Sequence, residues 1–86
     1  MSTLTDEQVK EIARNAANAH GVPVKDIVLA PTIGSTGDPA LEIKYILPPG
    51  FSLTASSSAA VSQVIMEMAD ADDRRIPIVR YASARP

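Results

Sequence analysis

Apolar side chains near the N-terminus recur every three or four residues, which places them on one side of a helix. Thr5 followed by Gln8 fits a capping box, in which the two side chains exchange hydrogen bonds with the backbone of the first turn. Gly21 is the expected end, because glycine readily takes the left-handed conformation that stops a helix. We therefore predict a helix from about Asp6 to His20. Its apolar residues are Val9, Ile12, Ala13 and Ala16.

Two β-type segments follow, separated by turn-forming residues. Ile27 to Ala30 is a short apolar run, and Pro31 after it cannot donate to a ladder and so belongs on an edge strand or at a bulge. Ala40 to Leu47 alternates between apolar and polar side chains, which is typical of a half-buried strand, and two prolines end it. Residues 33–39 between these segments are rich in turn formers, so we predict a hairpin loop.

A second helix and a final strand complete the predicted elements. The helix is expected from about Ser58 to Ala71, with one of the serines at 56–58 as its N-cap. Ile76 to Tyr81 is expected to be a strand, with Pro77 at its start or at a sheet edge. We expect the chain ends, residues 1–4 and 82–86, to be frayed. The apolar residues of the second helix are Ala60, Val61, Val64, Ile65 and Met68.

The order α-β-β-α-β predicts one small two-layer α+β domain over residues 1–86. We expect a three-stranded, mostly antiparallel sheet with two helices packed on it, most simply on the same face. The second helix should make a right-handed crossover that brings the third strand parallel to the second. The third strand could pair with the first strand or take another edge position; pairing with the first gives the order 2-1-3, with the first strand in the centre.

The strands are more apolar than a two-layer domain requires. Residues 27–30 are apolar on both faces, and Ile46, Ile78 and Val79 extend this pattern to the other strands. The outer face of such a sheet is normally polar because it meets water. The surplus predicts that a partner covers the second face, most simply an identical chain on a two-fold axis. Helices on opposite faces would remove the surplus. The predicted contact residues are Val28, Ile46, Val79 and Tyr81.

Composition and charge exclude several classes of protein. The 86-residue chain has no cysteine, so disulfides and thiolate metal sites are excluded. Its formal net charge of −2 argues against a nucleic-acid binder, which normally presents a basic surface. It lacks the run of about 18 apolar residues that a membrane span needs. Its N-terminus does not resemble a signal peptide, so a cytoplasmic location is expected.

No residue pattern indicates catalysis, a metal or another cofactor. Asp70, Asp72 and Asp73 lack the spacing of a calcium loop, and the arginines that follow should pair with them at a solvated helix end. His20 is the only histidine, and a helix C-terminus favours a partly cationic imidazole there. No serine stands in a nucleophile elbow. We therefore predict no catalytic, metal-binding or cofactor-binding residue.

Two functional hypotheses remain. The favoured one is a small non-catalytic protein–protein interaction module, or an accessory or regulatory subunit, that binds itself or another protein through its sheet. The alternative is an anion or nucleic-acid binder built on Gly34-Ser35-Thr36-Gly37, a run that resembles the four-residue loop by which KH domains clamp a nucleic-acid backbone. That loop joins two helices in KH domains, whereas here it joins two strands, and Asp38 adds negative charge beside it. The residues of the alternative are Gly34, Ser35, Thr36, Gly37, Arg74, Arg75 and Arg80.

Overall fold

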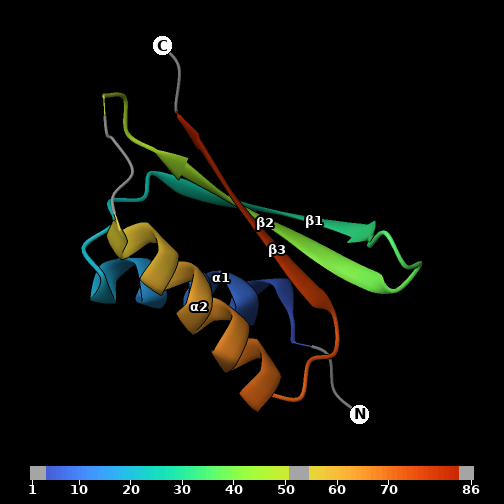
Figure 1. Ribbon diagram of the computed structural model, residues 1–86. Coiled ribbons are helices and arrows are strands. Elements are labelled where there is room, and N and C mark those ends of the chain that lie inside the picture. The colour runs from blue at the N-terminus through green and yellow to red at the C-terminus, as the bar shows by residue number, and fades with distance from the viewer. Residues whose placement is uncertain (1–3, 51–54, 84–86) are drawn as a thin grey trace.

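The described residues form two helices and three strands, in the order and the α+β class that the sequence predicts. The structure, a computed structural model, describes residues 4–50 and 55–83 (Figure 1). The elements are α1 (Asp6–Ala19), β1 (Asp26–Ile33), β2 (Pro39–Leu47), α2 (Ala55–Asp70) and β3 (Ile76–Ser83).

The sheet is mixed, and β2 rather than β1 lies at its centre. β1 pairs antiparallel with β2, so that Ile27 stands opposite Tyr45. β3 pairs with β2 on the other side in parallel, so that Tyr81 also stands opposite Tyr45. Of the placements that the sequence leaves open, the order 2-1-3 is therefore wrong, and β3 takes the edge beside β2. β1 is suited to the edge because Pro31 cannot donate a hydrogen bond to a further strand, whereas β2 contributes the most buried side chains of the three strands.

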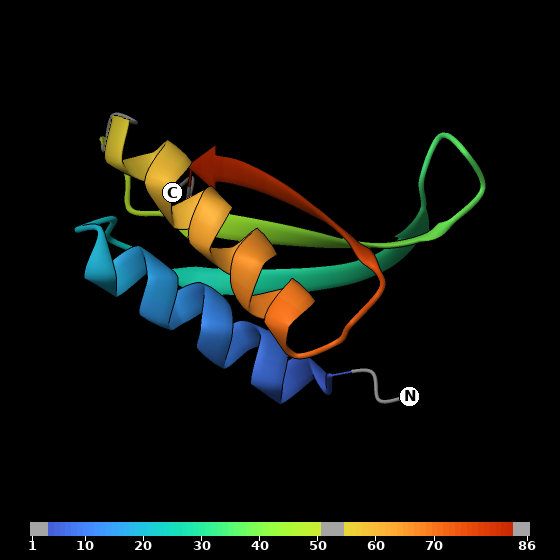
Figure 2. The same cartoon turned by 60° about the horizontal axis from the view of Figure 1, so that its bottom comes forward.

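Both helices pack on the same face of the sheet (Figure 2). α1 contacts β1, α2 contacts β3, and the two helices contact each other. The arrangement with helices on opposite faces is therefore wrong, and no helix among residues 4–50 and 55–83 covers the other face of the sheet. The core between the layers consists of Val9, Ala13, Ala16, Ala17, Val22, Ile27, Leu41, Ile43, Tyr45, Leu47, Ala60, Val64 and Met68.

The capping box predicted for α1 is confirmed. The Gln8 N–H donates to Thr5 Oγ1 at 3.2 Å, and the Thr5 N–H donates to Gln8 Oε1 at 2.9 Å. At the other end Gly21 has a φ of 71°, and the Val22 N–H donates to the carbonyl of Ala17 at 2.8 Å. This is a Schellman motif, in which a left-handed residue lets the chain reverse and satisfies the last carbonyls of the helix.

Thr5→Ala is expected to lower the free energy of unfolding by about 0.5–2 kcal/mol, because the Gln8 N–H loses its acceptor. Urea denaturation followed by circular dichroism measures this change. Thr5→Ser is the matched control, since it keeps the hydroxyl and should remain close to the parent. Equal stability of Thr5→Ala and Thr5→Ser would show that the capping box does not stabilise the fold.

The second helix begins earlier than its serines suggest. α2 begins at Ala55, so residues 56–58 lie inside the helix and none of them is its N-cap. Its end is also a Schellman motif: the N–H of Asp72 donates to the carbonyl of Ala69 at 3.0 Å, and the N–H of Asp73 donates to that of Met68 at 3.1 Å. Asp72 takes the left-handed conformation here, with a φ of 64°.

The chain is ordered closer to its ends than predicted. Leu4 packs against the core, and Ala82 and Ser83 belong to β3. Residues 1–3 and 84–86, the rest of the segments expected to fray, lie outside the described residues. Both corrected ends depend on tertiary contacts with distant parts of the chain, which local sequence patterns do not contain.

Candidate interaction surfaces

The face of the sheet opposite the helices, here called the open face, carries aliphatic side chains around an ion pair. Val28 is 44% exposed, and Ile46 and Ile78 are half-buried. Arg80 Nε lies 2.7 Å from Glu42 Oε2, and these side chains are 63% and 28% exposed. The central part of the open face consists of Val28, Ala30, Glu42, Lys44, Ile46, Ile78, Arg80 and Ala82.

The four contact residues predicted from the sequence do not share one surface. Val28 and Ile46 lie on the open face, but Val79 and Tyr81 point to the helices and pack against the core. The phenol of Tyr81 donates to the carbonyl of Ser57 in α2 at 2.9 Å. A single interface made of all four residues is therefore wrong, because successive residues of a strand point to opposite faces.

Tyr45 and Tyr81 form a stacked pair that attaches both helices to the sheet. Their ring centroids lie 5.2 Å apart, and the ring planes differ by 15°. The Tyr45 hydroxyl donates to the carbonyl of Ala13 in α1 at 2.7 Å, as Tyr81 does to α2. Burial raises the pKa of Tyr45 well above its ordinary value, and the adjacent Tyr81 raises it further. The hydroxyl of Tyr45 thus stays protonated and remains a donor.

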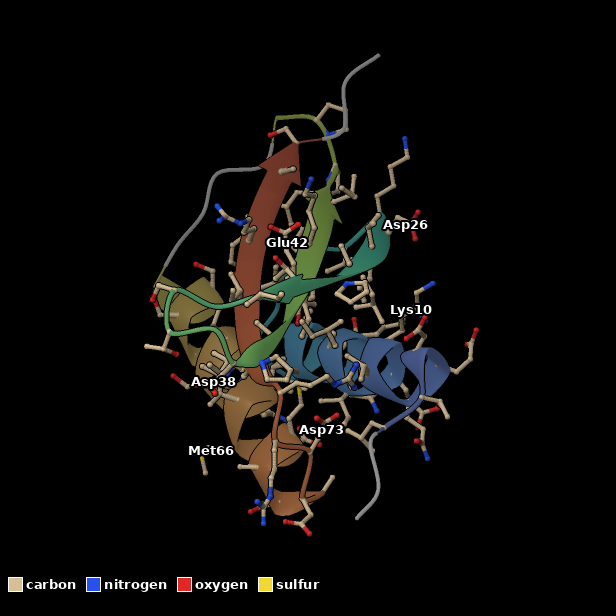
Figure 3. The ribbon with its side chains drawn as sticks, turned by 90° about the vertical axis from the view of Figure 1, so that its right-hand side faces the viewer. Lys10, Asp26, Asp38, Glu42, Met66 and Asp73 are labelled. Atoms are coloured by element: carbon tan, nitrogen blue, oxygen red, sulfur yellow. The ribbon has the colours of Figure 1, made fainter. Side chains whose placement is uncertain are left out.

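Asp73 connects three elements at one end of the molecule, where the start of α1, the end of α2 and the start of β3 meet (Figure 3). Its side chain is fully buried and lies 2.7 Å from Arg75 Nη2. The same carboxylate accepts hydrogen bonds from the backbone N–H groups of Leu4 at 3.2 Å and Arg75 at 3.0 Å. Arg75 Nη2 also donates to the carbonyl of Leu4 at 3.1 Å. We call these three residues the Asp73 clamp.

The environment of the Asp73 clamp corrects the sequence interpretation. The hydrogen bond from the Arg75 side chain is the main reason that the pKa of Asp73 lies below its usual value, and the backbone donors add to this effect. Arg75 pairs with an aspartate as predicted, but Asp73 does not belong to a solvated helix end. The turn at Asp72 reverses the chain and directs the next carboxylate toward the N-terminal segment.

The hairpin loop uses its own hydrogen-bond donors. The Gly34 N–H donates to the carbonyl of Asp38 at 2.8 Å, and the Gly37 N–H donates to the carbonyl of Gly34 at 2.9 Å. The hydroxyl of Thr36 donates to the Asp38 carboxylate at 2.8 Å, which places a negative charge where an anion would have to bind. These contacts use donors that a phosphate would need, so they do not favour phosphate binding. Ser35, within the same loop, is exposed.

The arginines of the anion hypothesis are dispersed rather than gathered at the loop. Arg75 belongs to the Asp73 clamp, and Arg80 pairs with Glu42 on the open face. Arg74 is exposed. Two of the three arginines therefore already have carboxylate partners, so they would attract a phosphate ligand less strongly.

His20 joins the two helices. It is the residue that caps the end of α1, and its Nε2 lies 2.9 Å from Oε1 of Gln63 in α2. This contact shows which side of α2 faces α1. Among the residues that the structure describes, three or more histidine or acidic side chains do not come together as a metal ion would require.

The exposed side of α2 is a surface that the sequence pattern did not identify. Ile65 and Met66 are 43% and 63% exposed, although Ile65 was expected in the apolar stripe of the helix. Helical geometry explains the difference: at about 100° per residue, Ile65 lies to one side of the buried residues Ala60, Val64 and Met68. The low content of charged residues in α2 was the signal available in the sequence.

Comparisons with protein-family models, curated proteins and solved structures found no match for this chain. Within the described ranges, neither helix combines the length and apolar character needed to cross a membrane. The surfaces that indicate a function are the open face, the exposed side of α2 and the edges of the sheet.

Proposed function

We propose that this chain is a small non-catalytic protein-interaction module, in an accessory or regulatory role, that associates with an identical chain through its sheet. The observation that carries the proposal is that both helices cover one face and leave aliphatic side chains on the other. Fully burying an aliphatic side chain contributes roughly 1.5–3 kcal/mol, so a partner that covers them gains free energy.

The charges on the open face favour a protein partner over a polyanion. Arg80 and Glu42 form an ion pair within it, and the single lysine there, Lys44, lies opposite Val28 on the neighbouring strand. Binding to nucleic acid draws its free energy from several unpaired cations that displace counterions. The nearly balanced charge supports association through apolar contacts. A cytoplasmic location belongs to the same proposal and is compatible with the absence of cysteine.

Sedimentation velocity over a range of protein and salt concentrations tests this function. We expect a dimer that dissociates on dilution and is as stable or more stable in high salt, because apolar association is not screened. A labelled single-stranded oligonucleotide, added in the same buffers, should not bind. A monomer at every concentration would refute self-association. Oligonucleotide binding that weakens steeply with salt would instead support the nucleic-acid hypothesis.

A further inference from the structure

The outer edge of β3 is less protected than that of β1. In the described part of the chain both strands pair on one side only, because β2 lies between them. β1 contains Pro31 in its middle, which is one of the devices that keep an edge strand from pairing. β3 has Pro77 only at its start, and its one charged residue, Arg80, is neutralised by Glu42. The edge of β3 is therefore the one available for a further strand.

One side of α2 lies beside this edge. Gln63 contacts His20, and Gln63 also donates to Glu67, so this side of α2 faces α1. The opposite side must then face outward above β3, the strand that α2 contacts (Figure 2). Helical periodicity puts four exposed residues there. This group, the α2 flank, consists of Ser58, Ser62, Ile65 and Ala69.

We propose that a second copy of this chain binds at the β3 edge and the α2 flank, a contact separate from the open face whose aliphatic side chains support the proposed function. The two β3 strands pair antiparallel about a two-fold axis perpendicular to the sheet, and the two sheets become one of six strands. This symmetry keeps the helices of both copies on the same side, so each α2 flank meets the other. The inference rests on the proposed self-association.

The charge distribution favours a second copy over a different protein. A two-fold axis brings the same surface of both copies together, so any charge in its centre meets a like charge. The α2 flank is uncharged, and the acidic residues of the helix, Glu67 and Asp70, lie away from it. α2 and β3 run in opposite directions (Figure 1), and the hydroxyl of Tyr81 near the end of β3 donates to the carbonyl of Ser57 near the start of α2. Arg80 lies in the middle of β3 and would come near the Arg80 of the second copy, but each guanidinium is paired with Glu42 of its own chain.

The area of this surface is sufficient for a small specific interface. The 8 residues of β3 extend over about 26 Å. The 16 residues of α2 extend over about 24 Å. Two layers give a depth of about 20 Å, so each copy contributes about 500 Å² and the pair about 1,000 Å², which is the lower limit for a stable protein–protein interface. A dimer with a dissociation constant in the micromolar range is therefore expected.

Ile65→Glu tests this interface, with Met66→Glu as its matched control. Ile65 is in the α2 flank, whereas Met66 points away from the body of the protein (Figure 3). Ile65→Glu should raise the dimer dissociation constant at least about tenfold, because two carboxylates would meet in an apolar contact. Met66→Glu should leave it nearly unchanged. Both sites are exposed, so melting temperatures close to the parent will confirm that the variants fold.

Amide hydrogen exchange tests the strand pairing directly. Exchange in residues 76–83 should slow as the concentration of the parent or of Met66→Glu rises, and should not depend on concentration in Ile65→Glu. Concentration-independent exchange in a dimeric parent would refute the pairing of β3 with its copy. This measurement separates pairing of the strands from contacts made by α2 alone.

Ile46→Glu on the open face distinguishes this inference from the proposed function. Dimers that survive Ile46→Glu but dissociate with Ile65→Glu support the β3 edge. The reverse result would overturn the β3 interface while self-association through the open face stands. A monomeric parent at all concentrations would overturn both.

Discussion

Asp73→Ala is expected to lower the free energy of unfolding by about 3 kcal/mol, because it leaves a largely buried arginine without its carboxylate. The substitution also removes the acceptor of the Leu4 N–H, so the residue before α1 loses one of its two hydrogen bonds to the segment before β3. Urea denaturation at neutral pH measures the loss. Asp70→Ala, an exposed aspartate at the end of the same helix, is the matched control and should change stability little. A similar loss in both variants would show that the clamp is not the cause.

The Asp73 clamp should also make stability depend on pH in the acid range. Because Arg75 holds the pKa of Asp73 low in the folded state, the unfolded chain takes up a proton first as the pH falls. The stabilisation is complete above the ordinary pKa of an aspartate, about 4, and is lost as the pH falls through that value and then through the lowered one. Asp73→Asn should therefore lose less stability between about pH 5 and pH 3 than the parent does. An unchanged slope would show that other carboxylates dominate acid unfolding.

Tyr45→Ala is expected to lower the free energy of unfolding by about 3–5 kcal/mol, the range found when a buried aromatic ring is replaced by a methyl group. Tyr45 is fully buried in the central strand, stacks on Tyr81 and donates to the carbonyl of Ala13. The substitution thus opens a cavity where the sheet meets both helices. Urea denaturation measures the change, and hydrogen exchange of α1 and α2 shows whether both helices loosen.

Tyr45→Phe separates the ring from its hydroxyl. It keeps the packing and the stack but removes one hydrogen bond, so a loss of only about 1 kcal/mol is expected. Tyr81→Phe, which removes the bond to the carbonyl of Ser57, should have a similar effect. A loss in Tyr45→Phe as large as that in Tyr45→Ala would mean that the hydroxyl, not the ring, stabilises the junction of sheet and helices.

The features that could be predicted from the sequence are those that depend on neighbouring residues. The capping box at Thr5 and Gln8 places the start of α1 correctly, because its two hydrogen bonds join residues three apart. The alternation of apolar and polar side chains likewise predicts a start for β2 that differs by one residue from the observed start, Pro39. Gly21 marks the end of α1. Each of these signals acts within one turn or one strand.

The errors concern contacts between distant parts of the chain. The strand order depends on a comparison between strands: β2 buries the most side chains, and β1 contains a proline that suits an edge position. A local sequence pattern does not make this comparison. The sequence pattern groups Val79 and Tyr81 with Val28 because β3 is apolar on both sides. Only the pairing of Tyr81 with Tyr45 decides which side of β3 faces the helices. The burial of Asp73 depends on Leu4, which is distant in sequence.

The contact between Leu4 and Asp73 joins residues 69 positions apart, and this separation has a kinetic consequence. Bringing such distant residues together costs more chain entropy than closing the β1–β2 hairpin, so this contact should form late in folding. Contacts that form after the rate-limiting step leave the folding rate nearly unchanged and slow unfolding instead. The hairpin and α1 would then determine how quickly the chain folds. The contact between Leu4, just before α1, and Asp73, in the turn between α2 and β3, would determine how long the chain stays folded.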